Sequence, residues 1–87
     1  MKKTITLTTT ELDLITTICL FVEGEVSTYE DTIIIHPLNK DAEGYIQINR
    51  KEKEVGFVDF GIDTKTYFAV VGFAMCRNYT TEDYFLG

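Results

Sequence analysis

Three short segments in the middle of the chain constrain the fold most strongly, because each has the composition of a β-strand. Residues 32–35 are Thr-Ile-Ile-Ile, and Pro37 ends this strand because proline cannot donate to a sheet. Residues 45–49 alternate apolar and polar side chains, and residues 55–60 form a third segment after a charged connection. The spacing predicts three consecutive antiparallel strands, a β-meander.

The sequence before the meander predicts one strand and one helix. Residues 4–8 alternate threonine with isoleucine and leucine, which is typical of a short edge strand. Thr8 and Glu11 match a capping box, in which each side chain accepts a hydrogen bond from the other's backbone N–H. A helix should begin there and end at Gly24. Helical spacing is followed by Leu14, Ile15, Ile18, Cys19 and Val22. The β-branched residues 15–18 favour a strand instead, and we expect the helix.

Residues 67–76 are apolar throughout, so periodicity alone does not separate a buried helix from a buried strand. Two alanines and the potential caps Asp63 and Thr64 favour a helix, whereas two valines and Gly72 favour a strand. We expect the helix. The segment 80–86 is too short for more than one helical turn, and its aromatic residues suggest that it docks on the body of the protein or on a partner.

These elements predict a small α+β fold, in which an antiparallel β-meander packs with one or two helices. A chain of 87 residues has room for one hydrophobic core, so we expect residues 1–87 to form a single domain. The longest apolar run has ten residues, fewer than the roughly 18–20 that span a bilayer, and we expect no membrane segment.

The chain offers few residues for catalysis or metal binding. His36 is the only histidine, and with Cys19 and Cys76 it does not supply the four closely spaced ligands of a structural zinc site. The glycines form neither a Walker A loop nor a dinucleotide-binding turn. We therefore expect no enzyme activity, no cofactor and no metal. A carboxylate enzyme and a carboxylate-bound Mg²⁺ or Ca²⁺ ion are left as alternatives.

The two cysteines lie 57 positions apart, each within an apolar stretch. A buried free cysteine behaves as a small apolar residue, and secreted domains of this size usually carry four or more cysteines. We expect two buried thiols in a cytoplasmic protein. A disulfide and a reactive thiol are the alternatives.

Charge is distributed unevenly along the chain. It has 14 acidic and 8 basic residues, a net charge of −6, which repels nucleic acid and anionic membranes. Residues 9–49 alone hold eight acidic residues against Lys40, a local charge of −7. An acidic face that keeps the protein soluble is one interpretation. The other is a surface that docks on a basic protein groove.

We identify partner-binding candidates among these acidic residues. Four of them, Glu23, Glu25, Glu30 and Asp31, crowd the predicted helix exit and the entry to the next strand. Tyr29 lies among them and is the kind of rigid aromatic residue that anchors protein interfaces. The complete predicted site consists of Glu23, Glu25, Tyr29, Glu30, Asp31, Asp41 and Glu43.

The runs Val-Glu-Gly-Glu at 22–25 and Ser-Thr-Tyr-Glu-Asp at 27–31, in a small acidic α+β domain, resemble the small acidic inhibitors encoded by phages and mobile elements, such as anti-CRISPR proteins. The resemblance is one of general character and includes no shared motif. It implies a non-enzymatic inhibitor that binds a basic host protein or ribonucleoprotein complex, and occludes its nucleic-acid-binding or activation surface. Direct binding of nucleic acid is not expected.

A second interpretation is a small-molecule-binding or assembly module with an aromatic pocket, which includes a pocket at a homodimer interface. Its walls would come from Tyr45, Phe57, Phe60, Tyr67, Phe68 and Phe73, which could equally be ordinary core residues.

Overall fold

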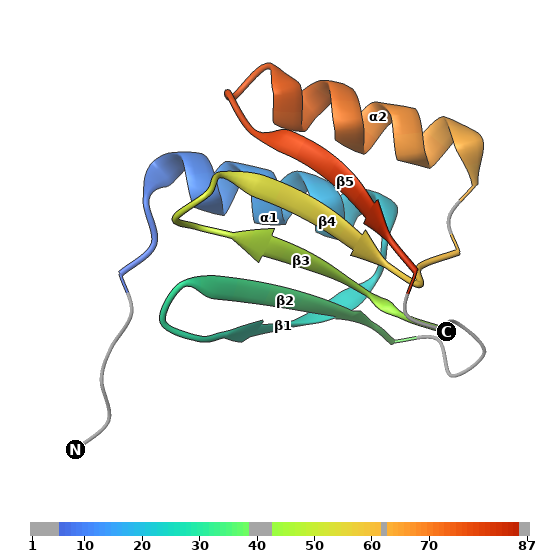
Figure 1. The fold of residues 1–87 in the computed structure, drawn as a ribbon, viewed down its shortest axis with the longest axis horizontal. Coiled ribbons are helices and arrows are strands. Elements are labelled where there is room, and N and C mark those ends of the chain that lie inside the picture. The colour runs from blue at the N-terminus through green and yellow to red at the C-terminus, as the bar shows by residue number, and fades with distance from the viewer. Residues whose placement is uncertain (1–5, 39–42, 62, 86–87) are drawn as a thin grey trace.

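The computed structural model describes residues 6–38, 43–61 and 63–85, which form two helices and five strands (Figure 1). In chain order the elements are α1 (Thr9–Phe21), β1 (Gly24–Thr28), β2 (Thr32–Pro37), β3 (Tyr45–Asn49), β4 (Glu54–Val58), α2 (Thr64–Met75) and β5 (Thr80–Tyr84). The predicted meander is confirmed as β2, β3 and β4, and the helix expected within 67–76 is confirmed as α2.

All five strands belong to one sheet, in the order β1-β2-β3-β4-β5. Neighbouring strands from β1 to β4 are antiparallel, whereas α2 carries the chain back so that β5 pairs with β4 in parallel (Figure 1). The expected α+β single domain is therefore confirmed. Its sheet is mixed rather than purely antiparallel, and it is wider by one strand at each edge.

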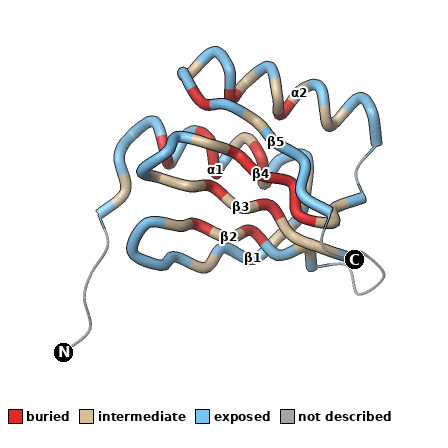
Figure 2. Tube along the Cα trace, in the orientation of Figure 1, coloured by how far each residue is buried: buried red, intermediate tan, exposed pale blue. Residues whose placement is uncertain are grey.

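Both helices contribute to one core with the same face of the sheet. Side chains alternate between the two faces of a strand, and every second residue of β2 and β3 is buried in this core (Figure 2). In β4, Val55 and Phe57 belong to the core, although all of residues 55–58 are buried. The main core residues are Ile33, Ile35, Ile46, Ile48, Val55 and Phe57 from the sheet, with Leu14, Ile18, Val70 and Ala74 from the helices. The opposite face of the sheet has no helix on it among the described residues.

The capping box at the start of α1 is confirmed. The Glu11 N–H donates to Thr8 Oγ1 at 3.1 Å, and the Thr8 N–H donates to Glu11 Oε1 at 2.7 Å. The strand predicted over 4–8 is wrong for residues 6–8, which are not in a strand, because Thr8 serves as the helix cap. Residues 4 and 5 lie outside the described part of the chain.

Two strands were not predicted. The helix α1 ends at Phe21, and Gly24, expected to end that helix, begins β1. The tail expected to form at most one helical turn is the strand β5. Both strands lie at the edges of the sheet and are mostly exposed, so their sequences lack the apolar alternation of a buried strand.

The environment of the cysteines is only partly as expected. Both thiols are free, but Cys76 is exposed and Cys19 is half-buried. The prediction of two buried thiols is therefore wrong for Cys76. The helix α2 is apolar on all sides in sequence, yet only Val70 and Ala74 of it are buried, and Cys76 follows its last turn on the solvent side.

Candidate functional site

The acidic segment between the predicted helix exit and the next strand forms part of a β-hairpin. The strands β1 and β2 are joined by Tyr29, Glu30 and Asp31, and the hairpin closes with two hydrogen bonds between Tyr29 and Thr32, of 2.7 Å and 3.4 Å. Five paired positions then extend from Thr28–Ile33 to Gly24–Pro37. The segment with the highest density of acidic residues therefore forms one edge of the sheet.

Most of the predicted site residues lie on this hairpin. Glu23 precedes β1 and Glu25 lies on it, whereas Tyr29, Glu30 and Asp31 occupy its turn, and all five are exposed. A strand extends about 3.3 Å per residue, so Glu23 and Glu25 lie roughly 13–20 Å from the turn that begins at Tyr29. We call the segment 23–31 the acidic hairpin. The sheet brings its residues to one edge but in two clusters.

The other two residues of the predicted site lie outside the segment 23–31. Glu43 is exposed and lies just before β3, at the end of the sheet where Glu23 lies, because β3 begins opposite the end of β2. Asp41 lies outside the described residues.

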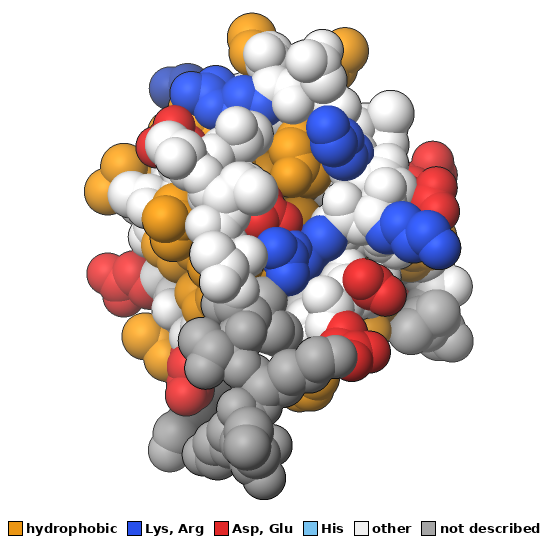
Figure 3. Space-filling view, turned by 90° about the vertical axis from the view of Figure 1, so that its left-hand side faces the viewer, with side chains coloured by type: hydrophobic (Ala, Val, Ile, Leu, Met, Phe, Trp, Pro, Cys, Tyr) orange, Lys and Arg blue, Asp and Glu red, His pale blue; other side chains and the backbone are white. Residues whose placement is uncertain are grey.

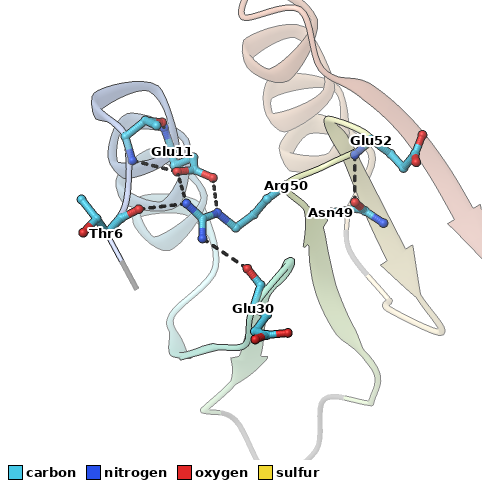
Figure 4. A network of polar contacts seen from close by, with 7 residues as sticks. Thr6, Glu11, Glu30, Asn49, Arg50 and Glu52 are labelled. Carbon is cyan, nitrogen blue, oxygen red and sulfur yellow. Dashed lines mark hydrogen bonds and ion pairs between the residues drawn. The ribbon is translucent and has the colours of Figure 1, made fainter. Parts of the chain in front are cut away.

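One of the eight acidic residues between positions 9 and 49 is not available to a partner. Glu11 is buried, with 4% of its surface exposed, although aspartate and glutamate are rarely buried unless paired. The Arg50 guanidinium binds both of its carboxylate oxygens, Nε to Oε2 at 2.5 Å and Nη2 to Oε1 at 3.0 Å (Figure 4). Sequence analysis identified Glu11 as a cap but missed this ion pair, since its partner lies 39 positions away.

Arg50 connects four segments of the chain. Besides Glu11 on α1, it donates to the backbone oxygen of Thr6 at 2.9 Å and to that of Glu30 at 3.4 Å (Figure 4). Its own N–H donates to the Asp31 oxygen at 2.8 Å. The side chain therefore fixes the turn of the acidic hairpin against the start of α1, which gives that turn a defined position.

The ion pair shifts the pKa values of both Glu11 and Arg50. Hydrogen bonding from Arg50 lowers the pKa of Glu11, against the opposing effect of burial, and the Thr8 cap lowers it further. The hydrogen bond to Glu11 raises the pKa of Arg50, helped by the charge of Asp31. Both groups are therefore charged at neutral pH and compensate each other, so they do not have the shifted neutral form that acid–base catalysis uses.

A hollow of about 700 Å³ opens beside this ion pair. Figure 3 shows basic side chains around it with acidic ones close by. Its basic lining residues are Arg50, Lys51, Lys53 and Arg77, and Glu30 and Asp31 also line it. Arg50 is held by Glu11, and Arg77 lies over the Phe73 ring at 3.4 Å. The turn of the acidic hairpin thus borders basic groups, whereas the end at Glu23 and Glu25 is away from this hollow.

The aromatic residues proposed as pocket walls are mostly core residues. Four of them lie in or against the hydrophobic core: Phe57, Phe60, Tyr67 and Phe73. Phe57 is buried in the core against Tyr67, with ring centroids 5.0 Å apart. Phe68, next to Tyr67 on α2, is 64% exposed. Tyr45 and Phe60 line a separate hollow of about 590 Å³ with polar residues and Phe85. Neither this hollow nor the one beside the Arg50–Glu11 ion pair is lined by all six side chains.

The described part of the chain contains neither a metal-binding cluster nor a membrane-spanning helix. Among the described residues there is no group of three or more His, Cys, Asp or Glu side chains placed to hold a metal ion. No helix in that part of the chain has the length and apolar character to cross a membrane. Comparisons with protein-family models, with curated proteins and with solved structures found no match to this chain.

Proposed function

We propose that this protein is a non-enzymatic inhibitor that binds a partner protein through the acidic hairpin. The surface that it covers is a basic one, of the kind that binds nucleic acid. The resemblance to anti-CRISPR inhibitors narrows the proposed partner to a nuclease complex of host defence. Inhibition then results from occlusion, with no substrate turned over.

One observation carries the proposal: the acidic residues between α1 and β2 are exposed together along one edge of the sheet. Four carboxylates and no basic side chain occur between positions 23 and 31, a local charge of −4. Complementary charge across an interface accelerates encounter and selects partners. Tyr29 lies beside these carboxylates and is 56% exposed. Its ring supplies an aromatic contact that anchors the interface, in addition to the attraction between charges.

The neutralisation of Glu11 supports the same assignment. If the acidic residues served only solubility, their position in the fold would not matter. Of the eight between positions 9 and 49, Glu11 is held in a structural ion pair, and four are exposed together on the acidic hairpin. The hairpin is also held in place, because Arg50 binds its turn through two backbone oxygens. A fixed edge loses little conformational entropy on binding.

A charge-reversal experiment tests the proposal. The variant Glu23→Lys, Glu25→Lys, Glu30→Lys, Asp31→Lys is compared with a control that reverses four exposed acidic residues elsewhere: Asp13, Glu52, Asp63 and Glu82. Both variants have the same net charge. A partner captured from bacterial lysate, identified by mass spectrometry and purified, is used to measure affinity for each.

We expect the hairpin variant to lose binding and the control to retain it. The wild-type complex should weaken with salt and should compete with nucleic acid for the partner. The melting temperature of the control should stay within a few degrees of wild type, because surface substitutions cost little. The hairpin variant should melt somewhat lower, because Glu30 and Asp31 lie near Arg50 and Lys51, and both variants must be folded at the temperature of the binding assay. Equal loss in both variants, or binding unaffected in both, would show that the acidic hairpin is not the docking surface.

A further inference from the structure

The outer side of β1 is unpaired among the described residues. Backbone groups of an antiparallel strand point alternately to one neighbour and to the other. Tyr29 exchanges hydrogen bonds with Thr32, and at the opposite end the Leu38 N–H donates to the Glu23 oxygen at 3.0 Å. The odd-numbered residues of this strand therefore bond to β2. It follows that three residues direct their N–H and C=O groups away from the sheet: Gly24, Val26 and Thr28.

Two of the three residues that carry these outward groups are exposed. Thr28 is exposed and Val26 is 37% exposed, while Gly24 is half-buried. Unpaired groups on a sheet edge pair readily with another extended chain. A β-carbon at position 24 would lie 2.7 Å from Ile35 Cγ2 and 2.8 Å from the His36 oxygen, so glycine lets β1 approach β2 closely there.

We propose that β1 binds an extended segment of the partner, which adds to the sheet as a further strand beyond β1. This inference rests on the proposed function and specifies how the acidic hairpin holds its target. The backbone of β1 supplies hydrogen bonds, and its flanking carboxylates select the charge of the added strand.

The side chains of β1 define what this strand must carry. Glu25 pairs with His36 and lies on the open face of the sheet, whereas Val26 pairs with the buried Ile35 and lies on the helix face. Opposite charges placed across neighbouring strands stabilise a sheet, and so do apolar pairs. The fitting segment therefore alternates lysine or arginine, on the side of Glu25, with an apolar residue that covers Val26.

A second copy of this chain is a poor occupant of the same edge. Pairing β1 with β1 would bring together two hairpins that each carry four carboxylates and no basic residue. Like charges on adjacent strands destabilise a sheet, and charged residues on edge strands prevent such self-association. The charge of the edge thus favours a basic strand from a different protein.

One pair of variants separates strand addition from attraction by charge. Val26→Pro removes an outward N–H and adds a ring there, while it leaves all four carboxylates and the bonds to β2 intact, since proline is tolerated on an edge. Val26→Thr is the control that keeps the N–H. For the purified partner, we expect Val26→Pro to lower affinity about tenfold or more and Val26→Thr to change it little. Thermal melts check that both variants are folded.

A synthetic probe gives a direct readout. The capped peptide Thr-Lys-Val-Lys-Val-Lys-Thr is added to the full chain, and amide exchange is followed by NMR. We expect exchange at Gly24, Val26 and Thr28 to slow. A peptide of the same charge, N-methylated at alternate residues so that it cannot donate to β1, should give no such protection.

The outcomes distinguish this inference from the proposed function. If the methylated and unmodified peptides bind equally, or if neither slows exchange at the three residues, strand addition is wrong. The same holds if Val26→Pro binds the partner as wild type does. The proposed function survives these results as long as charge reversal of the acidic hairpin still abolishes binding.

Discussion

Arg50 and Glu11, 39 positions apart, form a two-point ion pair that joins the turn after β3 to the start of α1. The planar guanidinium matches the two carboxylate oxygens, a geometry that lysine does not reproduce. Glu11 also completes the capping box with Thr8, so a single carboxylate both starts a helix and holds a distant turn. The stability of the fold should therefore depend strongly on this one pair.

Removal of either partner should destabilise the protein, and by different amounts. Glu11→Gln should cost about 1.5–3 kcal/mol, the range for hydrogen bonds to charged groups. Arg50→Met should cost more, because it leaves the buried Glu11 without a counter-charge. Urea denaturation measures both variants and the double variant. Fully additive losses in the double variant would contradict a direct coupling between the two side chains.

The same pair predicts how stability depends on pH. The folded state lowers the pKa of Glu11 from its ordinary value of 4.5, through its bonds with Arg50. The stabilisation that the Glu11 charge provides is therefore complete above the pKa that Glu11 has in the unfolded chain. It is lost as the pH falls through the lower pKa that Glu11 has in the folded protein. The difference in urea midpoint between wild type and Glu11→Gln should be largest near pH 7 and shrink in acid. A difference that stays constant down to pH 3 would show that the charge of Glu11 is unimportant.

The sequence was most informative where the chemistry is local. Thr8 and Glu11 predicted the start of α1, because a capping box is read from two residues three positions apart. The meander was predicted because Ile33, Ile46 and Val55 belong to segments with strong β propensity. Such signals need no knowledge of distant contacts.

The parts that sequence analysis missed depend on contacts between distant residues. The strand β5 contains Thr80 and Glu82, which have no buried alternation, and it is a strand because α2 returns the chain beside β4. The candidate site was predicted as a set of acidic residues, and most of them do lie on one hairpin. The pairing of Glu11 with Arg50 could not be predicted, because neither local sequence contains a signal that identifies a partner 39 positions away.

Gly56 and Tyr84 should be coupled across β4 and β5. A β-carbon at position 56 would lie 2.8 Å from the Tyr84 ring, closer than real contacts allow. The ring packs there while its hydroxyl donates to the Glu54 carboxylate. We expect Gly56→Ala to cost about 1–3 kcal/mol, the usual cost of overpacking, although alanine normally suits a strand interior better than glycine.

A second background tests this coupling. In a Tyr84→Ala protein the ring is absent, so Gly56→Ala should become neutral or slightly stabilising. Thermal or urea unfolding is measured for wild type, both single variants and the double variant. It shows directly whether Gly56→Ala stabilises or destabilises the protein in each background. A loss of the same size in both backgrounds would place the strain in the backbone of β4 and not in contact with Tyr84.

The two cysteines should differ in reactivity. Cys76 is exposed after α2, whereas Cys19 is half-buried on α1 and packs against the core. Burial raises the pKa of the Cys19 thiol, which lowers the fraction of reactive thiolate. Under native conditions at pH 8, iodoacetamide should therefore modify Cys76 first, and Cys19 should react at a comparable rate only in denaturant. Mass spectrometry of timed samples measures both rates, with Cys76→Ser as the control that isolates Cys19. Equal rates in the folded protein would contradict the prediction that packing of Cys19 against the core protects its thiol.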